Sequence, residues 1–519
     1  MTAAVLIDVI SIQDYIFSSN KLKENVGASY LIKSMYEDIL KESLKDVVGG
    51  ILGICSWKKN PDDIKILQGS DYEIGYIGGG NSLLFFKSKD NAADFIKSYS
   101  KALLQKAPGL KTAFGIDDNF NVNDYSNSIK RIHENLKKNK SMFSTNTVIP
   151  KHGITADCPR SGESAEFCEN AGASQNDKQY ISAVSKTKLE ASEKALQELN
   201  EQYKILLSNQ YTFTNGFEKL GQSKGENNYI AVVHIDGNNM GEKIKACKNL
   251  CEMRKLSLCM FEAVEKSFYE VIQLITEKMK IMGESQNNIV QFSQENGKIV
   301  LPLRPIILGG DDLTFVCEGR FGILLSELFL KKYSEHKWNN EPLNACAGIC
   351  IVKTKYPFYR AYHLAESLCK TSKKRSKENK GESYLDFLIS SSGFSGTLEE
   401  IRKQYYTGHS GNLHFGPYCV DSSDNPESIK NLKNMVCKFN EWKNSSYLMK
   451  LRELLQRADS EELNFFVKKL EQKNLSLPEI PEHFYHQKVF QDRRTPYFDV
   501  VESIDFYPSI LMDGMEEQS

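Results

Sequence analysis

The chain has 519 residues, 40% of them hydrophobic and 26% charged, and its formal net charge is −1. This length exceeds a single hydrophobic core, so about two to four domains are expected. The balanced charge gives no global attraction to nucleic acid or to a membrane surface. No stretch approaches the roughly 20 apolar residues of a membrane helix, and the 12 cysteines follow no disulfide framework. We therefore expect a cytoplasmic protein with reduced thiols and no membrane partner.

The first part of the chain alternates strand and helix patterns. Residues 3–10 form an apolar run typical of a buried strand, and residues 12–40 have helical spacing that we expect to be interrupted at Gly27. Further along, the patterns predict strands at 73–77 and 82–87, a helix at 91–105 and a strand at 112–116. A tight glycine turn joins the two central strands, so the pattern predicts an α+β fold around a β-hairpin.

The same order of elements recurs in the second half. The patterns predict a strand at 229–236, a long helix at about 249–282, a hairpin at 305–317, a helix at 321–335, a strand at 344–352 and a helix at 358–373. When the first strands are matched, Asp8 falls on Asp236 and Ala113 falls on Cys346. Elements repeated in this order predict an internal duplication.

The segments outside the two copies have helical spacing. A charged helix is expected from about 176 to 208, and residues 447–455 are also typical of a helix. We therefore expect four domains, which are the first copy, a connecting region, the second copy and a C-terminal helical region, over residues 1–120, 121–225, 226–395 and 396–519.

The two hairpin turns differ in their acidic residues. The second copy has Gly309, Gly310, Asp311 and Asp312 where the first has Gly78, Gly79, Gly80 and Asn81. If the strand that ends at Asp236 lies beside the second hairpin, its carboxylate converges with those of Asp311 and Asp312. Such oxygen ligands suit two Mg²⁺ or Mn²⁺ ions that bridge substrate phosphates. The alternative is a plain hairpin turn, because Gly and Asp are common in turns.

Two further features of the second copy suit phosphate binding. A glycine-rich step from strand to helix follows Asp236 and exposes backbone N–H groups, at Gly237, Asn238, Asn239 and Gly241. A simple helix cap by Asn is the alternative. Lys373 lies in the basic end of the last helix and is a candidate phosphate ligand, although a solvated helix end explains it equally well.

Cys158 and Cys168 lie in the connecting region, with His152 nearby. A structural zinc site needs four ligands at close spacing. Because only two or three candidates are in reach here, we expect free thiols and no zinc.

These motifs resemble a known family. The run from Asp236 to Gly241, the Gly-Gly-Asp-Asp hairpin and the helix that ends at Lys373 are similar to the large polymerase-like subunit of type III CRISPR effectors. The opening segment Ser11 to Phe17 is similar to that family's first palm domain. More distantly, the hairpin resembles the GGDEF diguanylate cyclases, which share the palm fold.

The resemblance implies two ferredoxin-like palm domains that form a pseudo-dimer within one chain, with helical inter-palm and C-terminal domains. It implies that the second palm joins ATP molecules into cyclic oligoadenylates and that Asp236, Asp311 and Asp312 hold the metals. We expect the first palm to bind a nucleotide through Gly79, Asn81 and Ser82 without performing chemistry. Since one chain then carries both palms, dimerisation should not be required for catalysis.

The chain also departs from the family. Many members begin with a nuclease domain built on a His-Asp pair, whereas none of the nine histidines here is followed by Asp. The chain begins directly in the first palm, so we expect no DNA cleavage. The family's zinc cysteines are reduced here to Cys158 and Cys168.

Three hypotheses for the function follow. The first is a cyclic oligonucleotide synthase, either a stand-alone defence protein or one bound to RNA-guided effector subunits and target RNA. The second is a non-catalytic scaffold that binds nucleotide or RNA. The third is a template-dependent polymerase, which the neutral net charge does not support.

Overall fold

The computed structural model describes most of the chain, over residues 2–49, 56–78, 80–142, 153–170, 178–220, 228–284, 292–379, 381–390, 393–422, 425–442, 445–457, 459–479 and 489–507. Gly79 and His152 lie outside these residues. The chain divides into two compact units, which we describe separately. One consists of Met1–Tyr203, Asn239–Glu265 and Ile306–Asp312, and the other of Lys204–Asn238, Lys266–Pro305 and Leu313–Ser519.

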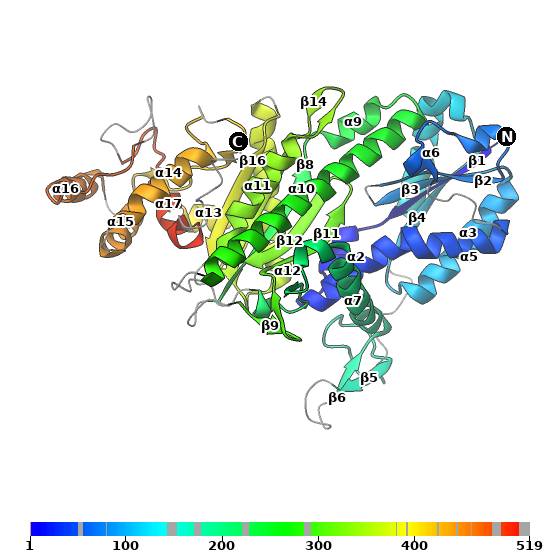
Figure 1. Cartoon of the computed structure of the whole chain (residues 1–519), viewed down its shortest axis with the longest axis horizontal. Helices are drawn as coiled ribbons and strands as arrows, with labels where there is room; N and C mark the ends of the chain where they lie inside the picture. Colours follow the sequence, from blue (N-terminus) through cyan, green and yellow to red (C-terminus); the bar gives the residue numbers. More distant parts are fainter. Residues whose placement is uncertain are drawn as a thin grey trace. The chain divides into compact units, whose positions relative to one another are not determined.

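The first unit contains a four-stranded sheet. Its strands are β1 (Thr2–Val9), β2 (Tyr72–Gly78), β3 (Asn81–Phe86) and β4 (Thr112–Phe120), in the order β2-β3-β1-β4. All neighbouring pairs are antiparallel. The main helices are α1 (Ile12–Phe17), α2 (Leu22–Ser34), α3 (Leu40–Val48), α5 (Lys89–Lys106) and α6 (Tyr125–Met142). In Figure 1, α3 and α5 lie on one side of this sheet and α6 lies on the other. The strand order and the helices between the strands define a ferredoxin-like fold.

Two helix boundaries in this unit differ from the sequence predictions. Gly27 does not interrupt a helix, because it lies inside α2. The helical segment is interrupted earlier, between α1 and α2. A Cβ atom at Gly27 would lie 1.7 Å from the carbonyl oxygen of Lys188 in helix α7 (Ala183–Gln202), so the glycine permits the close approach of two helices. Helix α7 starts after 176, because the strands β5 (Phe167–Asn170) and β6 (Lys178–Ile181) precede it.

The second palm sheet repeats this order and then extends it. Its strands are β8 (Tyr229–Gly237), β11 (Leu303–Gly309), β12 (Asp312–Glu318), β15 (Ala345–Lys353), β16 (Tyr384–Ser390) and β19 (Tyr418–Cys419). They lie in the order β11-β12-β8-β15-β16-β19. The first four repeat the order of the first sheet, and β16 then joins parallel to β15. The expected α+β architecture with two ferredoxin-like palms is therefore confirmed.

In the sequence, helices come between the strands of this second sheet or after them. They are α9 (Met240–Ala246), α10 (Leu250–Glu284), α11 (Gly322–Ser334), α12 (Phe358–Glu378), α13 (Leu398–Tyr405), α14 (Ile429–Asn440), α15 (Ser445–Arg457), α16 (Ser460–Glu471) and α17 (Tyr497–Ser503). Short elements complete the chain: α4 (Ser56–Lys59), α8 (Lys204–Leu207), β7 (Tyr211–Thr212), β9 (Gln294–Glu295), β10 (Lys298–Val300), β13 (Lys337–Trp338), β14 (Glu341–Pro342), β17 (Thr407–Gly408) and β18 (Gly411–Asn412). Within the described parts of the chain, no helix has the length and apolar character to cross a membrane.

The strand registers support the duplication residue by residue. Asp8 of β1 is opposite Ala113 of β4, and Asp236 of β8 is opposite Cys346 of β15. These are the positions that the sequence comparison matched. The carboxylates of Asp8 and Asp236 therefore occupy equivalent places in the two sheets.

Each copy also places a glycine where a helix crosses the sheet. A Cβ atom at Gly115 of β4 would lie 2.6 Å from a carbonyl oxygen of α6, and one at Gly348 of β15 would lie 1.9 Å from a carbonyl oxygen of α12. Any larger side chain would push the helix away from the strand. The two glycines thus allow equivalent helices to approach their sheets equally closely.

A buried arginine attaches the start of α10 to the first sheet. Arg254 has no exposed surface, and its Nη2 atom lies 2.7 Å from Glu73 Oε1 on β2. Its Nε donates to the carbonyl of Gly75 at 2.7 Å, and Nη1 donates to that of Asp63 at 3.0 Å. Because the buried charge has a carboxylate partner and several carbonyl acceptors, its desolvation is compensated.

A second buried charge network links the C-terminal region to β16. The side chain of His414 lies between Asp386 and Asp499, with Nε2 3.1 Å from Asp386 Oδ1 and Nδ1 3.2 Å from Asp499. Arg402 of α13 also binds Asp386, through Nη2 at 2.7 Å. Burial and the charge of Arg402 oppose protonation of the imidazole, but the two aspartates outweigh them and raise the pKa of His414.

We predict that this network makes stability depend on pH above about 6.5, the pKa of an unperturbed histidine. The folded-state pKa is raised, so the stabilisation is fully present below that pH and is lost as the pH rises through the folded-state pKa. Urea unfolding of wild type and His414→Gln between about pH 5.5 and 8.5 measures it. The difference in the free energy of unfolding between wild type and variant should shrink as the pH rises.

The exposed His409 offers a matched control, and His409→Gln should keep the wild-type pH profile. Parallel profiles of wild type and His414→Gln over this range would contradict the proposed charge network.

Candidate functional site

The candidate site lies at the end of β8 and the start of β12, which are neighbouring strands. Among the residues that the structure describes, His234, Asp236 and Asp312 offer ligand atoms that lie within 4.8 Å of one another. Two carboxylates this close suit a divalent cation with a preference for oxygen ligands. The predicted convergence of Asp236 with Asp312 is therefore present.

Asp311 is not one of these three residues. It follows Gly310 in the two-residue turn between β11 and β12. Gly310 has a φ of 66°, in the left-handed region that glycine adopts without strain. Among the described residues, no atom lies within 4 Å of a Cβ atom placed at Gly309, so this part of the chain leaves the backbone open there. The metal role of Asp311 stays a prediction.

His234 was missed in the sequence analysis, although it lies two residues before Asp236 on the same strand. Residues two apart in a strand share a face, and this spacing could have identified it. The ring is buried, and its Nδ1 atom lies 3.0 Å from Thr314 Oγ1. Burial lowers the pKa of His234 to about 4, so the imidazole is neutral at physiological pH. The imidazole therefore lies close to the two carboxylates without adding charge.

The side chain of Lys373 contacts the carboxylate of Asp236. Its ammonium group forms an ion pair with Asp236 Oδ2 and donates a hydrogen bond to the carbonyl oxygen of Gly237 at 2.9 Å. Both side chains of the ion pair are partly exposed, at 25% for Lys373 and 32% for Asp236. A divalent cation or a phosphate group can therefore reach this pair and exchange with either partner.

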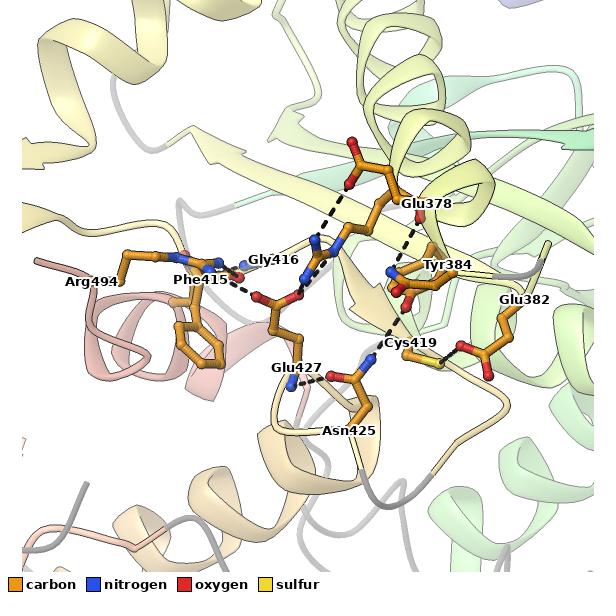
Figure 2. Close-up of polar contacts among 12 residues, drawn as sticks. Glu378, Glu382, Tyr384, Phe415, Gly416, Cys419, Asn425, Glu427 and Arg494 are labelled. Carbon is orange, nitrogen blue, oxygen red and sulfur yellow. Dashed lines mark hydrogen bonds and ion pairs between the residues drawn. The ribbon is translucent and has the colours of Figure 1, made fainter. Parts of the chain in front are cut away.

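Helix α12 carries Lys373 and is held on both sides of it. On the sheet side, Ser372 Oγ donates to the carbonyl oxygen of Ala347 at 3.0 Å. At its end, Arg375 Nη2 lies 2.7 Å from Glu427 Oε2, and Arg494 Nη1 lies 2.7 Å from Glu427 Oε1. Figure 2 shows Glu427 facing Arg494 in this cluster. Arg375 thus binds a protein carboxylate, although the sequence grouped it with the basic helix end.

The residues after Asp236 have different surroundings. Asn238 is buried, and its amide nitrogen donates to Ser376 Oγ at 3.0 Å, which ties the end of β8 to α12. Asn239 is exposed, with a φ of 57°, and its side chain makes no capping hydrogen bond to α9. A Cβ atom at Gly241 would meet nothing within 4 Å. The nucleotide-binding roles of Gly237, Asn238, Asn239 and Gly241 stay predictions.

The first copy has the equivalent lysine–aspartate ion pair but not the second carboxylate beside it. Lys140 of α6 binds Asp8 as Lys373 of α12 binds Asp236. Each lysine lies one helical turn beyond a residue that touches a strand glycine. This residue is Leu136, against Gly115, in α6, and Cys369, against Gly348, in α12. Asn81 takes the place of Asp312 and is opposite Asp8. The first copy therefore lacks the second carboxylate of the candidate metal site.

A cavity of about 360 Å³ lies at this position in the first copy, lined by Leu6, Asp8, Asn81, His133, Leu136, Lys137 and Lys140. The Oδ1 atom of Asn81 and the Oγ atom of Ser82 are buried and have no hydrogen-bond partner among the residues that the structure describes. Buried polar atoms without a protein partner are costly, so the Asn81 amide favours a polar ligand in this cavity.

Together, the ferredoxin-like sheet and the acidic strand ends define a palm-type domain. Residues 229–382 match the family model described as Cas10/Cmr2, second palm domain. Residues 229–382 are therefore similar to the second palm domain of this family. The resemblance to the large subunit of type III CRISPR effectors is confirmed for this region. No curated protein sequence matches the chain.

Solved structures extend the fold similarity to nearly the whole chain. A Csm1–Csm4 cassette in complex with cA3 has a TM-score of 0.54 at 12% identity, covering 97% of this chain and 69% of that chain. A Csm1–Csm4 cassette in complex with pppApA has a TM-score of 0.53 at 13% identity, with the same coverage. Csm1 from T. onnurineus has a TM-score of 0.50 at 14% identity, also with this coverage. At these identities, the similarity establishes the shared fold.

We predict that Asp312→Asn weakens Mn²⁺ binding by at least about tenfold, because even residues that only support a metal ligand contribute about 10–100-fold to affinity. Electron paramagnetic resonance titration of free Mn²⁺ measures this effect. Asp8→Asn is the control, since it removes the carboxylate equivalent to that of Asp236 from the copy that has Asn81 in place of Asp312. Equal losses of Mn²⁺ binding in the two variants would contradict the assignment of the site to the second palm.

Proposed function

We propose that the chain is a metal-dependent nucleotidyltransferase that condenses ATP into cyclic oligoadenylates, as a subunit or relative of type III CRISPR effectors. The observation that carries this proposal is the acidic pair Asp236 and Asp312 at the end of the second palm, beside an open glycine backbone at Gly309. The similar Csm1–Csm4 cassettes in complex with AMPPNP, pppApA and cA3 support ATP as the substrate class.

In the proposed reaction, the 3′-hydroxyl oxygen of one nucleotide bonds to the α-phosphorus of another. The bond from that phosphorus to the bridging oxygen breaks, pyrophosphate leaves, and the hydroxyl proton passes to solvent. Two Mg²⁺ or Mn²⁺ ions, when bound, would activate the hydroxyl and stabilise the pyrophosphate. Asp236 and Asp312 fit this role as oxygen ligands, and we retain Asp311 as a candidate third ligand.

We assign phosphate binding to Lys373 and to the backbone at Gly309 and Gly310. The ammonium group already lies at Asp236, so it can move to an incoming phosphate when a cation takes over the carboxylate. A glycine backbone without Cβ atoms leaves room for the nucleotide to lie against the turn.

We assign a second nucleotide to the cavity of the first palm. Lys137, Lys140 and His133 give it cationic or hydrogen-bonding groups, and Asn81 adds an unpartnered amide oxygen. Ser82 does not line this cavity, so its role in nucleotide binding stays a prediction. A positive charge suits a phosphate group that carries no metal of its own. This palm would then orient a nucleotide and leave the chemistry to the second palm.

We predict that Asp236→Asn and Asp312→Asn each lower product formation by at least about 100-fold, a cost of ~2.7 kcal/mol in the transition state. Each variant keeps the shape of the side chain and removes one charged metal ligand. Incubation with ATP and Mn²⁺, with and without RNA, followed by mass spectrometry of the products, measures the rate.

The exposed Asp90 provides a control, and Asp90→Asn should keep the wild-type rate. No product from the wild type under any of these conditions, with ATP still bound, would favour the alternative of a non-catalytic nucleotide-binding scaffold. Full activity of Asp236→Asn would exclude it as a metal ligand.

We predict that wild type binds two molecules of a non-hydrolysable ATP analogue and that Lys140→Ala weakens one site by roughly tenfold. A hydrogen bond to a charged group contributes about 1.5–3 kcal/mol, and partial exposure reduces this value. Isothermal titration calorimetry gives the stoichiometry and both affinities. The neighbouring Lys138 is exposed and does not line the cavity, so Lys138→Ala should leave both sites intact. A single site in wild type would contradict the role of the first palm.

A further inference from the structure

Two short segments with the same spacing meet in the first unit. One is Cys158-Pro159-Arg160-Ser161, which forms a turn closed by a hydrogen bond from Gly162 N to Cys158 O at 2.8 Å. The other is Ser182-Ala183-Val184-Ser185, which begins helix α7. The side chains of Cys158, Ser182 and Ser185 are buried, and Ser161 closes the cluster at the surface. We call these four residues the Cys-Ser knot.

Hydrogen-bonding groups connect the knot across both segments. Ser161 Oγ lies 2.9 Å from Ser182 Oγ, and Cys158 Sγ lies 3.7 Å from Ser185 Oγ. Ser182 Oγ also accepts a hydrogen bond from Ser185 N at 3.2 Å and so caps α7. The knot therefore joins the turn directly to the first residues of the helix.

The surroundings of the Cys158 sulfur also change its acidity. Burial of the thiol opposes its ionisation, but the Ser161 side chain and N–H groups of Ser161, Ser182 and Arg160 lower the pKa of Cys158 to about 6. The contact with Ser185 Oγ, which comes from the opposite segment, holds the sulfur in place.

The spacing of the knot is that of a zinc site, but its donors are not. Two pairs of ligands, each separated by two residues and joined by about 15–20 residues, are typical of four-cysteine zinc sites. Residues 162–181 separate the two pairs here, and serine occupies three of the four positions. Zinc takes thiolate, imidazole or carboxylate ligands, so one thiol and three hydroxyls do not fit it. Cys168, the other cysteine of this region, is an exposed free thiol on β5.

We propose that the Cys-Ser knot is a metal-free counterpart of a four-cysteine zinc site, in which hydrogen bonds among Cys158, Ser161, Ser182 and Ser185 replace the metal as the link between the turn and α7. The proposal concerns structure and does not depend on the proposed activity.

A neighbouring ion pair supports this structural role. Arg160, inside the turn, binds Glu24 of α2 through Nη1 at 3.0 Å and Gln179 of β6 through Nη2 at 2.9 Å. Helix α2 in turn packs against α7 at Gly27, where their backbones approach closely. The turn, α2 and α7 are thus connected by direct contacts that need no metal.

The first test measures metal in the purified full-length chain. Inductively coupled plasma mass spectrometry should find far less than one zinc per chain, and EDTA should leave Tm unchanged in protein purified without Mg²⁺ or Mn²⁺. Cys158→Ser should remain folded by circular dichroism, without any change in metal content, and Cys168→Ser is the matched control outside the knot. One zinc per chain that EDTA or Cys158→Ser removes, with a fall in Tm, would overturn the proposal.

The second test restores the ligands. The triple variant Ser161→Cys, Ser182→Cys and Ser185→Cys should bind one Co²⁺ per chain with the intense absorption of tetrahedral thiolate coordination, and Zn²⁺ should displace it and raise Tm. Adding Cys158→Ser to this variant should abolish the tetrathiolate spectrum. A folded triple variant that binds no Co²⁺ would show that the knot lacks the geometry of a zinc site. If the triple variant does not fold, the zinc content and EDTA response of wild type still decide the question.

Discussion

Each palm depends on the approach of a helix backbone to a glycine in the neighbouring strand. At Gly115 and Gly348, any Cβ atom would collide with a carbonyl oxygen of α6 or α12. The helix therefore lies directly on the sheet, and one turn further along its lysine reaches the carboxylate at the end of the first strand. The ion pairs of Asp8 with Lys140 and of Asp236 with Lys373 are a consequence of this packing.

The two copies share this framework and differ in the residue that opens the third strand. Asp312 gives the second palm two carboxylates near one point, while Asn81 leaves the first with one carboxylate and an adjacent cationic cavity. The electrostatics of one backbone arrangement thus suit a divalent cation in one copy and an anionic ligand in the other. Under the proposed function, this difference separates catalysis from nucleotide positioning.

Much of the fold could be predicted because the hydrophobic residues of its strands and helices follow a clear periodicity. The predicted match of Asp8 with Asp236 agrees with the strand registers of the two sheets. Gly27 was misinterpreted as a helix break, because a glycine that permits close helix packing has the same sequence signal. His234 could have been found from its spacing to Asp236. The Cys-Ser knot could not, because serines at zinc-site spacing carry no signal until their side chains are seen to meet.

The central claim is that only the second palm holds divalent metal. Anomalous diffraction from crystals of the chain grown with Mn²⁺ and a non-hydrolysable ATP analogue tests it most directly. The account predicts manganese peaks beside the carboxylates of Asp236 and Asp312, with none beside Asp8 and Lys140. A manganese peak at Asp8, or none at Asp312 with the analogue bound, would contradict it.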